Sequence, residues 1–227
     1  MGNAGYVSLS PSTMLNPTPV VLVSCAEKGN PENRDMVTVA WAGTVNSEPP
    51  MVSVSLRKER YSHGLIESSG EFVVNLPDEA MCKAVDFCGV RSGRDTDKSR
   101  ETGLRYIPAE NMSVAPTVDG APVSLSCRVK QVIPLGSHDM FLGEVVAVRV
   151  REDLIDEKGS LHLEKAKLIS YSHGLYQKLG DVMGFFGWSV ARKEVLDKRM
   201  AQYRLTPDRD ASDLQPACPA SPLQNKR

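Results

Sequence analysis

The sequence predicts a mainly β protein, built as an antiparallel barrel with short flanking helices. Several segments alternate apolar and polar residues with the two-residue period of a half-buried strand, and few segments carry the period of a long helix. Many strands combined with few long helices are typical of barrels. The chain has 227 residues, of which 41% are hydrophobic, so it is long enough to bury a substantial core.

The first part of the chain is expected to supply most of one sheet. Residues 17–25 are apolar and predict a buried strand, whereas residues 26–35 are polar and predict a loop. Residues 36–45 then predict one long strand. The further elements expected here are a strand over 51–57 after a proline pair, a short helix over 61–69 and a strand over 70–76.

A second helix is expected to begin at Asp78. Acidic residues occupy its first turn, and Met81, Val85 and Cys88 recur at spacings of four and three residues. Residues 89–103 are polar and rich in glycine and charge, so they predict a loop with at most one helical turn.

The later part of the chain predicts a long hairpin on the far side of the sheet. Residues 121–133 and 138–150 are both strand-like, and the turn residues PLGS join them. A last strand is expected over 166–172, and a charged helix from 193 to about 204.

These elements predict three regions. Residues 1–16 form an N-terminal arm, residues 17–192 the barrel domain and residues 193–227 a helical and disordered tail. The tail is expected to be disordered after the helix because its Pro, Asp, Ser and Ala residues have almost nothing to bury.

Composition excludes several classes of protein. There are 27 basic and 28 acidic residues, a formal net charge of −1, so nothing in the overall charge favours nucleic acid or an anionic membrane as a partner. The five cysteines form no CxxC pair, so no metal site or disulfide framework is expected. No apolar run reaches membrane-spanning length, and the N-terminus lacks the pattern of a secretory signal. We therefore expect a reduced, cytoplasmic protein.

A local cluster of cations follows the third expected strand. Arg57, Lys58 and Arg60 lie where the strand passes into the helix over 61–69, and Ser62 lies at the start of that helix. One interpretation is a phosphate cradle, because a helix N-terminus and basic side chains both favour an anion. The alternative is a set of solvated cations beside a strand end, with Ser62 as an ordinary N-cap.

A stretch of small residues precedes this cluster. Ala40, Ala42 and Gly43 would let a flat ligand approach the backbone closely, and Trp41 offers an aromatic face. The alternative is a twisted strand with a glycine bulge and a tryptophan in the core.

Several motifs occur together in a specific order. TVAWAG is followed by PP, by SLRKERY, by FVVNLP, by SGRDTDK and by GSHDMFLGEV. In this order they resemble the flavin reductase-like, FMN-binding split-barrel family, and most closely its flavoredoxin-type members. The resemblance extends over about residues 19–189.

The resemblance implies a homodimer of split barrels, with FMN in a groove near the subunit interface. The strand formed by Thr38, Val39, Ala40, Trp41, Ala42 and Gly43 would line the isoalloxazine ring. The phosphate would be surrounded by Ser55, Leu56, Arg57, Lys58, Tyr61 and Ser62. The loop residues Ser92, Gly93, Arg94, Asp95 and Lys98 would close over the cofactor, although a polar loop of this kind is otherwise simply solvated.

Single residues also receive roles from the resemblance. Asn75 would support the ribityl chain or the ring edge, with a strand-ending turn as the alternative. His138 would lie near the flavin face or the nicotinamide pocket, and is the candidate catalytic residue; a partly exposed histidine without a role is the alternative. That simpler interpretation applies to the other histidines, His63, His162 and His173.

Two tyrosines and one cysteine leave two interpretations each. Tyr171 and Tyr176 would pack either near the flavin or in the core. Cys25 is either a thiol near the ring or an inert core residue.

Three functions therefore remain open. The first is an NAD(P)H-dependent flavin reductase that transfers hydride to FMN. The second is a flavoredoxin-like electron carrier with tightly bound FMN, fed by a protein donor; the third is a non-catalytic flavin-binding module. The sequence has no glycine-rich dinucleotide fingerprint, so any NADH or NADPH would lie in the open groove beside FMN.

Overall fold

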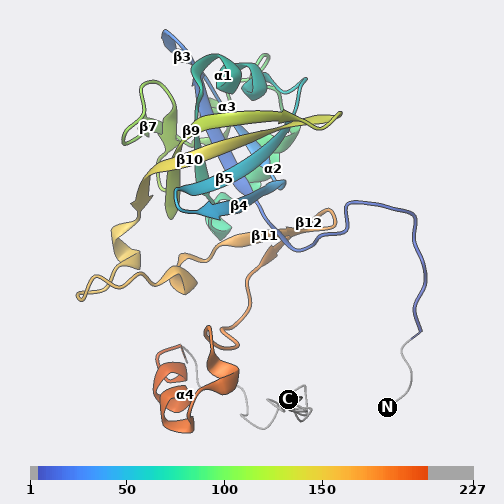
Figure 1. Cartoon of the computed structure of the whole chain (residues 1–227). Helices are drawn as coiled ribbons and strands as arrows, with labels where there is room; N and C mark the ends of the chain where they lie inside the picture. Colours follow the sequence, from blue (N-terminus) through green and yellow to red (C-terminus); the bar gives the residue numbers. More distant parts are fainter. Residues whose placement is uncertain (1–4, 204–227) are drawn as a thin grey trace. The chain divides into compact units, whose positions relative to one another are not determined.

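The computed structural model describes residues 5–203, and the chain divides into two compact units, Met1–Gly180 and Asp181–Arg227. The first unit contains every strand of the described chain (Figure 1). Among the described residues, no helix is long and apolar enough to cross a membrane.

One sheet of seven strands forms the body of the first unit, with the order β3-β2-β6-β9-β10-β5-β4. Every pairing in it is antiparallel. The expected mainly β architecture is therefore confirmed. Its strands are β2 (Val21–Glu27), β3 (Asn30–Val39), β4 (Ala42–Ser47), β5 (Pro50–Arg57), β6 (Glu71–Leu76), β9 (Val123–Pro134) and β10 (His138–Val150).

Smaller elements surround this sheet. A three-stranded sheet contains β1 (Thr18–Pro19), β11 (Ile169–Ser172) and β12 (Leu175–Lys178), and a two-stranded sheet contains β7 (Tyr106–Pro108) and β8 (Pro116–Val118). The α-helices of the first unit are α1 (Tyr61–Ser69), α2 (Cys82–Val90) and α3 (Lys98–Thr102). The 3-10 helices of this unit are η1 (Glu79–Met81), η2 (Glu152–Leu154) and η3 (Leu163–Ala166).

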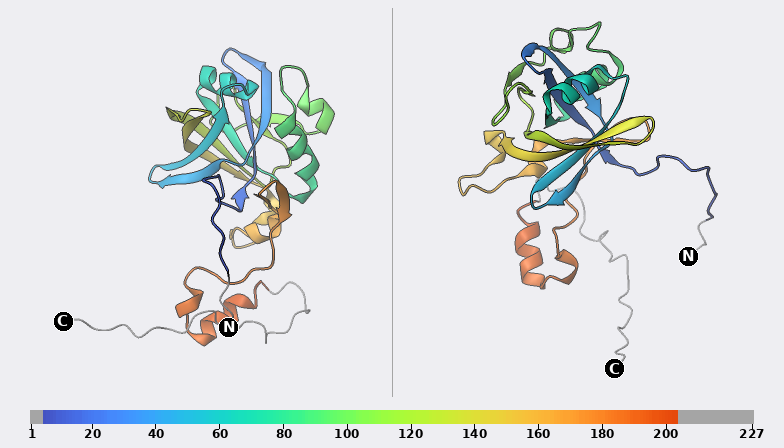
Figure 2. Two further views of the ribbon diagram at one scale, coloured as in Figure 1. Left: turned by 90° about the vertical axis from the view of Figure 1, so that its right-hand side faces the viewer. Right: turned by 45° about the horizontal axis from the view of Figure 1, so that its top comes forward.

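The two edge strands of the sheet are consecutive in the chain, so a short link brings the two ends of the sheet together. β3 and β4 lie at opposite ends of the strand order, yet only Ala40 and Trp41 separate them. The backbone N–H of Ser55 donates to the carbonyl of Trp41 at 2.9 Å, which fastens this link to β5. The seam of the barrel therefore lies at Ala40–Trp41. Figure 2 shows β4 and β5 as a pair of neighbouring light-blue strands.

Two cores lie on opposite faces of the sheet. Val23, Phe72 and Phe141 belong to the core inside the barrel, where each is fully buried. Leu22 and Val85 belong to a second core, which α2 covers. Strand β2 is buried along almost its whole length because its alternate residues face these two cores.

Three expectations about local structure were wrong. Residues 26–35 are not simply a loop, because β3 begins at Asn30 and its polar half pairs with the end of β2. The single strand expected over 36–45 is broken at the link, where the chain passes from one sheet edge to the other. The β9–β10 hairpin does not lie on a far side; it lies within the sheet, between β6 and β5.

Other expectations were confirmed. The helix over 61–69 is α1, which lies at one end of the barrel (Figure 1), and Asp78 caps the helical turn that leads into α2. The charged helix expected near the end of the chain is α4 (Lys193–Met200), in the second unit.

The second unit contains η4 (Trp188–Val190) before α4. The guanidinium of Arg199 lies 4.4 Å from the ring centre of Phe185 in this unit. Residues 204–227, where disorder was expected, lie outside the described residues, so that expectation and the boundaries of the three regions stay predictions.

Candidate functional site

A groove of about 370 Å³ lies along the seam of the barrel. Its walls come from the end of β3, the link, the end of β5, α2 and the β11–β12 hairpin. The residues that line it are Val20, Thr38, Val39, Ala40, Trp41, Ser55, Leu56, Arg57, Arg60, Asp86, Gly89, Val90, His138, Tyr171, Gly174 and Tyr176. The groove thus gathers residues from segments that extend from Val20 to Tyr176 in the sequence.

The wall formed by α2 lies close against β3. The hydroxyl of Thr38 donates to the carbonyl of Val85, and a Cβ added at Gly89 would lie 3.3 Å from the Cβ of Thr38. Glycine at position 89 therefore permits a close approach of helix and strand, which keeps this side of the groove narrow.

An aromatic pair borders the groove. His138 is the register partner of Arg57 on β5, and its ring stacks on that of Trp41 with centroids 6.3 Å apart and planes inclined by 14°. Trp41 is 49% exposed, so it is not a core residue as one interpretation held. The pair offers a flat aromatic surface with polar ring nitrogens beside a cation.

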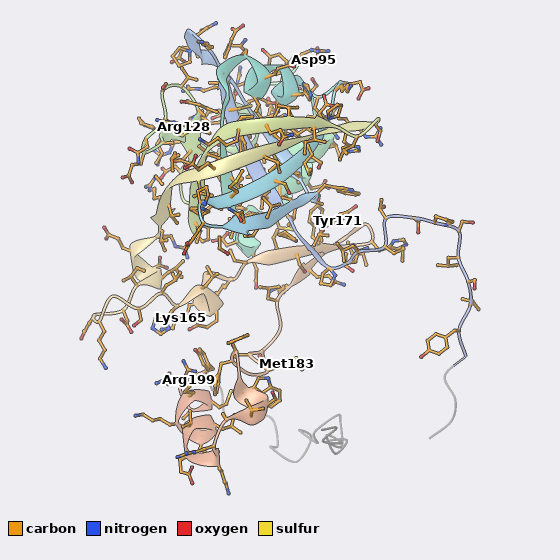
Figure 3. All side chains as sticks on the ribbon, in the orientation of Figure 1. Asp95, Arg128, Lys165, Tyr171, Met183 and Arg199 are labelled. Carbon is orange, nitrogen blue, oxygen red and sulfur yellow. The ribbon has the colours of Figure 1, made fainter. Side chains whose placement is uncertain are left out.

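The β11–β12 hairpin forms the opposite wall. The rings of Tyr171 and Tyr176 meet edge to face with centroids 5.6 Å apart, and Figure 3 labels Tyr171 on its strand. The Tyr176 hydroxyl donates to Asp86 Oδ1 at 3.2 Å. Burial, together with the nearby carboxylate, raises the pKa of Tyr176 to about 12. Both tyrosines therefore pack on the second core and line the groove.

A second cavity of about 270 Å³ adjoins the groove at its cationic end. We call it the cationic compartment. It is lined by Asp35, Val37, Arg57, Glu59, Arg60, Tyr61, Ser62, Val90, Arg91, Ser92, Gly93 and Lys98, of which Arg57, Arg60 and Val90 also line the groove. Three arginines, Arg57, Arg60 and Arg91, thus line one cavity beside the first turn of α1.

The N-cap of α1 differs from the expected one. Arg60 occupies that position with an extended backbone, and Ser62 is already inside the helix. The Ser62 hydroxyl donates to Asp35 Oδ2 at 2.5 Å instead of capping the helix. The alternative in which Ser62 is an ordinary N-cap was wrong, because a buried carboxylate accepts its hydrogen bond.

A buried ion pair fixes one wall of the cationic compartment. Lys98 Nζ lies 2.9 Å from Asp35 Oδ1 and donates to the Met36 carbonyl at 2.8 Å. Both charged side chains are 2% exposed. The ammonium of Lys98 is therefore occupied by partners within the protein.

The loop over residues 92–97 is anchored to this ion pair. A Cβ added at Gly93 would lie 2.5 Å from Asp35 Oδ1 and 2.8 Å from the ring of Tyr61, so only glycine fits. The guanidinium of Arg94 lies 5.9 Å from the Tyr61 ring centre. The loop is thus held by packing at one end, while Arg94 and Asp95 line an adjoining polar hollow of about 450 Å³, which shares Asp35, Gly93 and Lys98 with the compartment.

Lys58 and Arg57 lie on different sides of the β5 end. Lys58 Nζ is 3.5 Å from Asp139 Oδ1, and the other oxygen of Asp139 lies 2.9 Å from His63 Nε2. Burial alone would raise the pKa of Asp139, but the bond to His63 and the charge of Lys58 lower it. Of the two residues Arg57 and Lys58, only Arg57 lines the groove and the compartment.

The remaining histidines differ in their surroundings. His63 is buried, so the expectation of a partly exposed residue was wrong: its ring pairs with Asp139 and meets Phe141 edge to face. His162 lies between two carboxylates, whose hydrogen bonds raise its pKa. His173 has a φ of 47° in the β11–β12 turn.

Asn75 and Cys25 lie in the interior. The Asn75 side chain donates to Leu22 O and Ser24 Oγ, and accepts from Val118 N and Ser124 Oγ, so it joins β2, β8 and β9. It lies outside the groove and the compartment. Cys25 is fully buried, and burial raises the pKa of its thiol above the usual range, which favours the inert core interpretation.

The other small residues near the link line a neighbouring cleft, which shares Ala40 and Trp41 with the groove. Ala42 and Gly43 line an open apolar cleft of about 680 Å³, together with Trp41, Val45 and residues of the N-terminal arm. The structure therefore brings Thr38, Val39, Ala40 and Trp41 to the groove, but turns the next two residues toward this cleft.

Sequence reasoning missed several residues of the site. Arg91, Asp86 and Gly89 come from α2 or its end, and Gly174 comes from the β11–β12 turn. The helical period of α2 was predicted correctly. The residues on the exposed face of that helix could therefore have been considered as site residues. Arg60 was predicted as part of a possible phosphate cradle, although it was not among the residues that the family resemblance implied.

A closed antiparallel sheet with a ligand-sized groove at its seam defines a split-barrel protein. A family model described as "Flavin reductase like domain" matches residues 13–179, so the chain belongs to that family.

Solved structures support the same assignment. Flavoredoxin of Desulfovibrio vulgaris (Miyazaki F) is 28% identical, with a TM-score of 0.73 over 80% of this chain and 97% of that chain. Flavoredoxin from Methanosarcina acetivorans is 27% identical, with a TM-score of 0.73 over 80% and 95% of the two chains. An FMN-binding protein from Thermus thermophilus, solved with bound 1-cyclohex-2-enone, is 25% identical, with a TM-score of 0.63 over 78% and 96%.

The buried ion pair yields a stability prediction. Lys98→Met removes the ammonium and leaves the Asp35 carboxylate buried without its counter-charge, so the free energy of unfolding should fall by about 3–5 kcal/mol. Urea denaturation measures this change. The double variant Asp35→Asn with Lys98→Met removes both charges and should recover part of the loss; a double variant less stable than the single one would contradict the assignment.

Proposed function

We propose that the groove and the cationic compartment together bind FMN. The groove offers small residues and the stacked rings of Trp41 and His138, which suit a flat ring system. The compartment offers the guanidinium groups of Arg57, Arg60 and Arg91 to a phosphate.

The charge of the compartment carries this proposal. Its lining contains four cations (Arg57, Arg60, Arg91 and Lys98) and two acids (Asp35 and Glu59), a net charge of 4 − 2 = +2. Lys98 and Asp35 neutralise each other, so three guanidinium groups face one carboxylate. A phosphate monoester carries a charge of about −1.5 to −2 near neutral pH, which this excess matches.

We further propose that the protein is an NAD(P)H-dependent flavin reductase. Bound FMN would supply the hydride-accepting chemistry, while the protein supplies binding, orientation and electrostatics. Trp41 and His138 would limit the ring on one side, and Tyr171 and Tyr176 on the other. A dinucleotide would have to lie in the open groove beside the flavin.

A second candidate is an electron carrier that holds FMN permanently. The similarity to two flavoredoxins over most of this chain favours it. In that case a reduced protein partner, and not a pyridine nucleotide, would supply the electrons.

Arg57 should discriminate flavins by their phosphate. Arg57→Ala should weaken FMN binding by about 10- to 100-fold, the range for a lost charge-assisted hydrogen bond, and should change riboflavin binding much less because riboflavin has no phosphate. Fluorescence titration of each flavin measures both constants.

Lys58→Ala is the matched control for this experiment. It removes one cation from the neighbouring position, but its ammonium pairs with Asp139 outside the compartment, so the loss of FMN affinity should be several-fold smaller. If Arg57→Ala weakened FMN and riboflavin binding equally, the phosphate would not lie in the proposed compartment.

Reduction kinetics should separate the two candidate functions. In anaerobic stopped-flow mixing, the proposed reductase should lose its flavin absorbance within seconds of adding NADH or NADPH. Bleaching by a reduced protein donor, with both nucleotides inert, would instead identify an electron carrier.

We also propose that the protein is a homodimer formed through the apolar cleft. Trp41 and Val45 are each 49% exposed on this side of the sheet, and exposed apolar surface of this kind marks an interaction site.

The cleft gives a test of the dimer. Val45→Glu should shift the sedimentation coefficient from dimer toward monomer, because it places a charge in the interface. Val148→Glu introduces the same charge at an exposed position of β10 and should leave the dimer intact. Monomeric wild-type protein would rule the proposal out.

A further inference from the structure

One carboxylate lies among the residues that form the groove. Asp86, on α2, is the sole acidic residue among the described residues that line it. The arginines that line the groove, Arg57 and Arg60, also line the cationic compartment, whereas Asp86 does not. Val90 lines both cavities, and Asp86 precedes it by four residues, about 6 Å along the axis of α2. The carboxylate is thus set back by about one helical turn from the boundary with the compartment.

A hydrogen bond joins this carboxylate to the other wall of the groove. The Tyr176 hydroxyl donates to Asp86 Oδ1 at 3.2 Å, so the bond connects α2 to β12. Because the pKa of Tyr176 is raised to about 12, its phenol stays protonated and uncharged near neutral pH. The bond therefore fixes the position of the carboxylate without cancelling its negative charge.

The lysines nearest to Asp86 along the chain elements do not balance that charge at the groove. Lys178, two residues after Tyr176 on β12, lies 2.6 Å from Glu79 Oε2, with which it pairs. Lys83 precedes Asp86 by three residues on α2, where it is exposed, and it does not line the groove. The groove wall thus carries a negative charge at Asp86.

We infer that Asp86 lowers the reduction potential of the flavin bound in the groove. The inference rests on the proposed binding of FMN, and it applies to the reductase and to the electron carrier alike. In mildly alkaline solution, full reduction adds two electrons and one proton to the isoalloxazine, so the ring becomes more negative by one charge. A negative charge on the wall raises the energy of the reduced ring relative to the oxidised ring.

The sign of this effect does not depend on which edge of the ring faces α2. A fixed negative charge opposes the added charge from any direction, and only the size of the effect depends on distance and solvent. Asp86 is exposed, so water and salt weaken its field. We expect the charge to change the equilibrium constant of two-electron reduction by about two- to fivefold, which corresponds to about 9–21 mV.

An equilibrium redox titration of the FMN-loaded protein tests the inference without turnover of a substrate. With dithionite as the reductant and a dye of known potential as the reference, Asp86→Asn should raise the midpoint potential by about 9–21 mV. Asparagine has nearly the same size and still accepts the hydrogen bond of Tyr176, so this variant removes the charge and keeps the contact. Added salt should shrink the difference between the two proteins, because it screens the field.

Tyr176→Phe separates the charge from the packing of the wall. It removes the same hydrogen bond but leaves the carboxylate charged, so the potential should stay unchanged or fall. A rise like that of Asp86→Asn would mean that the hydrogen-bonded wall, and not the charge, sets the potential, and would overturn the inference. Glu67→Gln removes an exposed carboxylate of α1 outside both cavities and should leave the potential unchanged.

The outcomes separate this inference from the proposed function. If the protein binds FMN but Asp86→Asn leaves the midpoint potential unchanged or lowers it, the inference alone is overturned. If the wild-type protein does not bind FMN, the proposed function fails and the inference falls with it.

Discussion

The buried ion pair between Asp35 and Lys98 is the interaction on which the geometry of the site depends. It joins β3 to α3, and the Ser62 hydroxyl adds α1 to the same carboxylate. Two charges removed from water are costly, and they are tolerated only where hydrogen bonds satisfy them. Here the Met36 carbonyl and Ser62 do so. One wall of the cationic compartment is therefore held by bonds between three segments, and the loop at Gly93 packs onto it.

The separation of roles among the cations follows from this arrangement. Lys98 stabilises the wall, Lys58 pairs with Asp139, and the arginines remain to face the cavity. Arginine suits that position because its planar guanidinium binds phosphate oxygens in pairs. The region thus combines lysines that pair with carboxylates and arginines that line the cavity, and the net positive charge of the compartment comes from the arginines.

Local patterns were enough to predict much of the fold. The helix over 61–69, the helix start at Asp78 and the β9–β10 hairpin depend on neighbouring residues, and all three were predicted. The ion pair joins residues 63 positions apart, and the Asn75 network joins β2, β8 and β9, so no local pattern reveals either. The opposite directions of Arg57 and Lys58 were a missed signal, because successive residues at a strand end point to opposite sides.

The link between β3 and β4 has a consequence for what the barrel can admit. Val39 and Ala42 are the last and first residues of the two edge strands, and three peptide units connect them. An extended chain covers at most about 3.3–3.6 Å per residue, so these α-carbons cannot separate by more than roughly 11 Å. The covalent link therefore limits the distance between the two edge strands at this point of the seam, independently of the conformation of the neighbouring loops. A planar ligand that is one atom thick fits within this distance, whereas a bulky ligand would have to bind farther from the link.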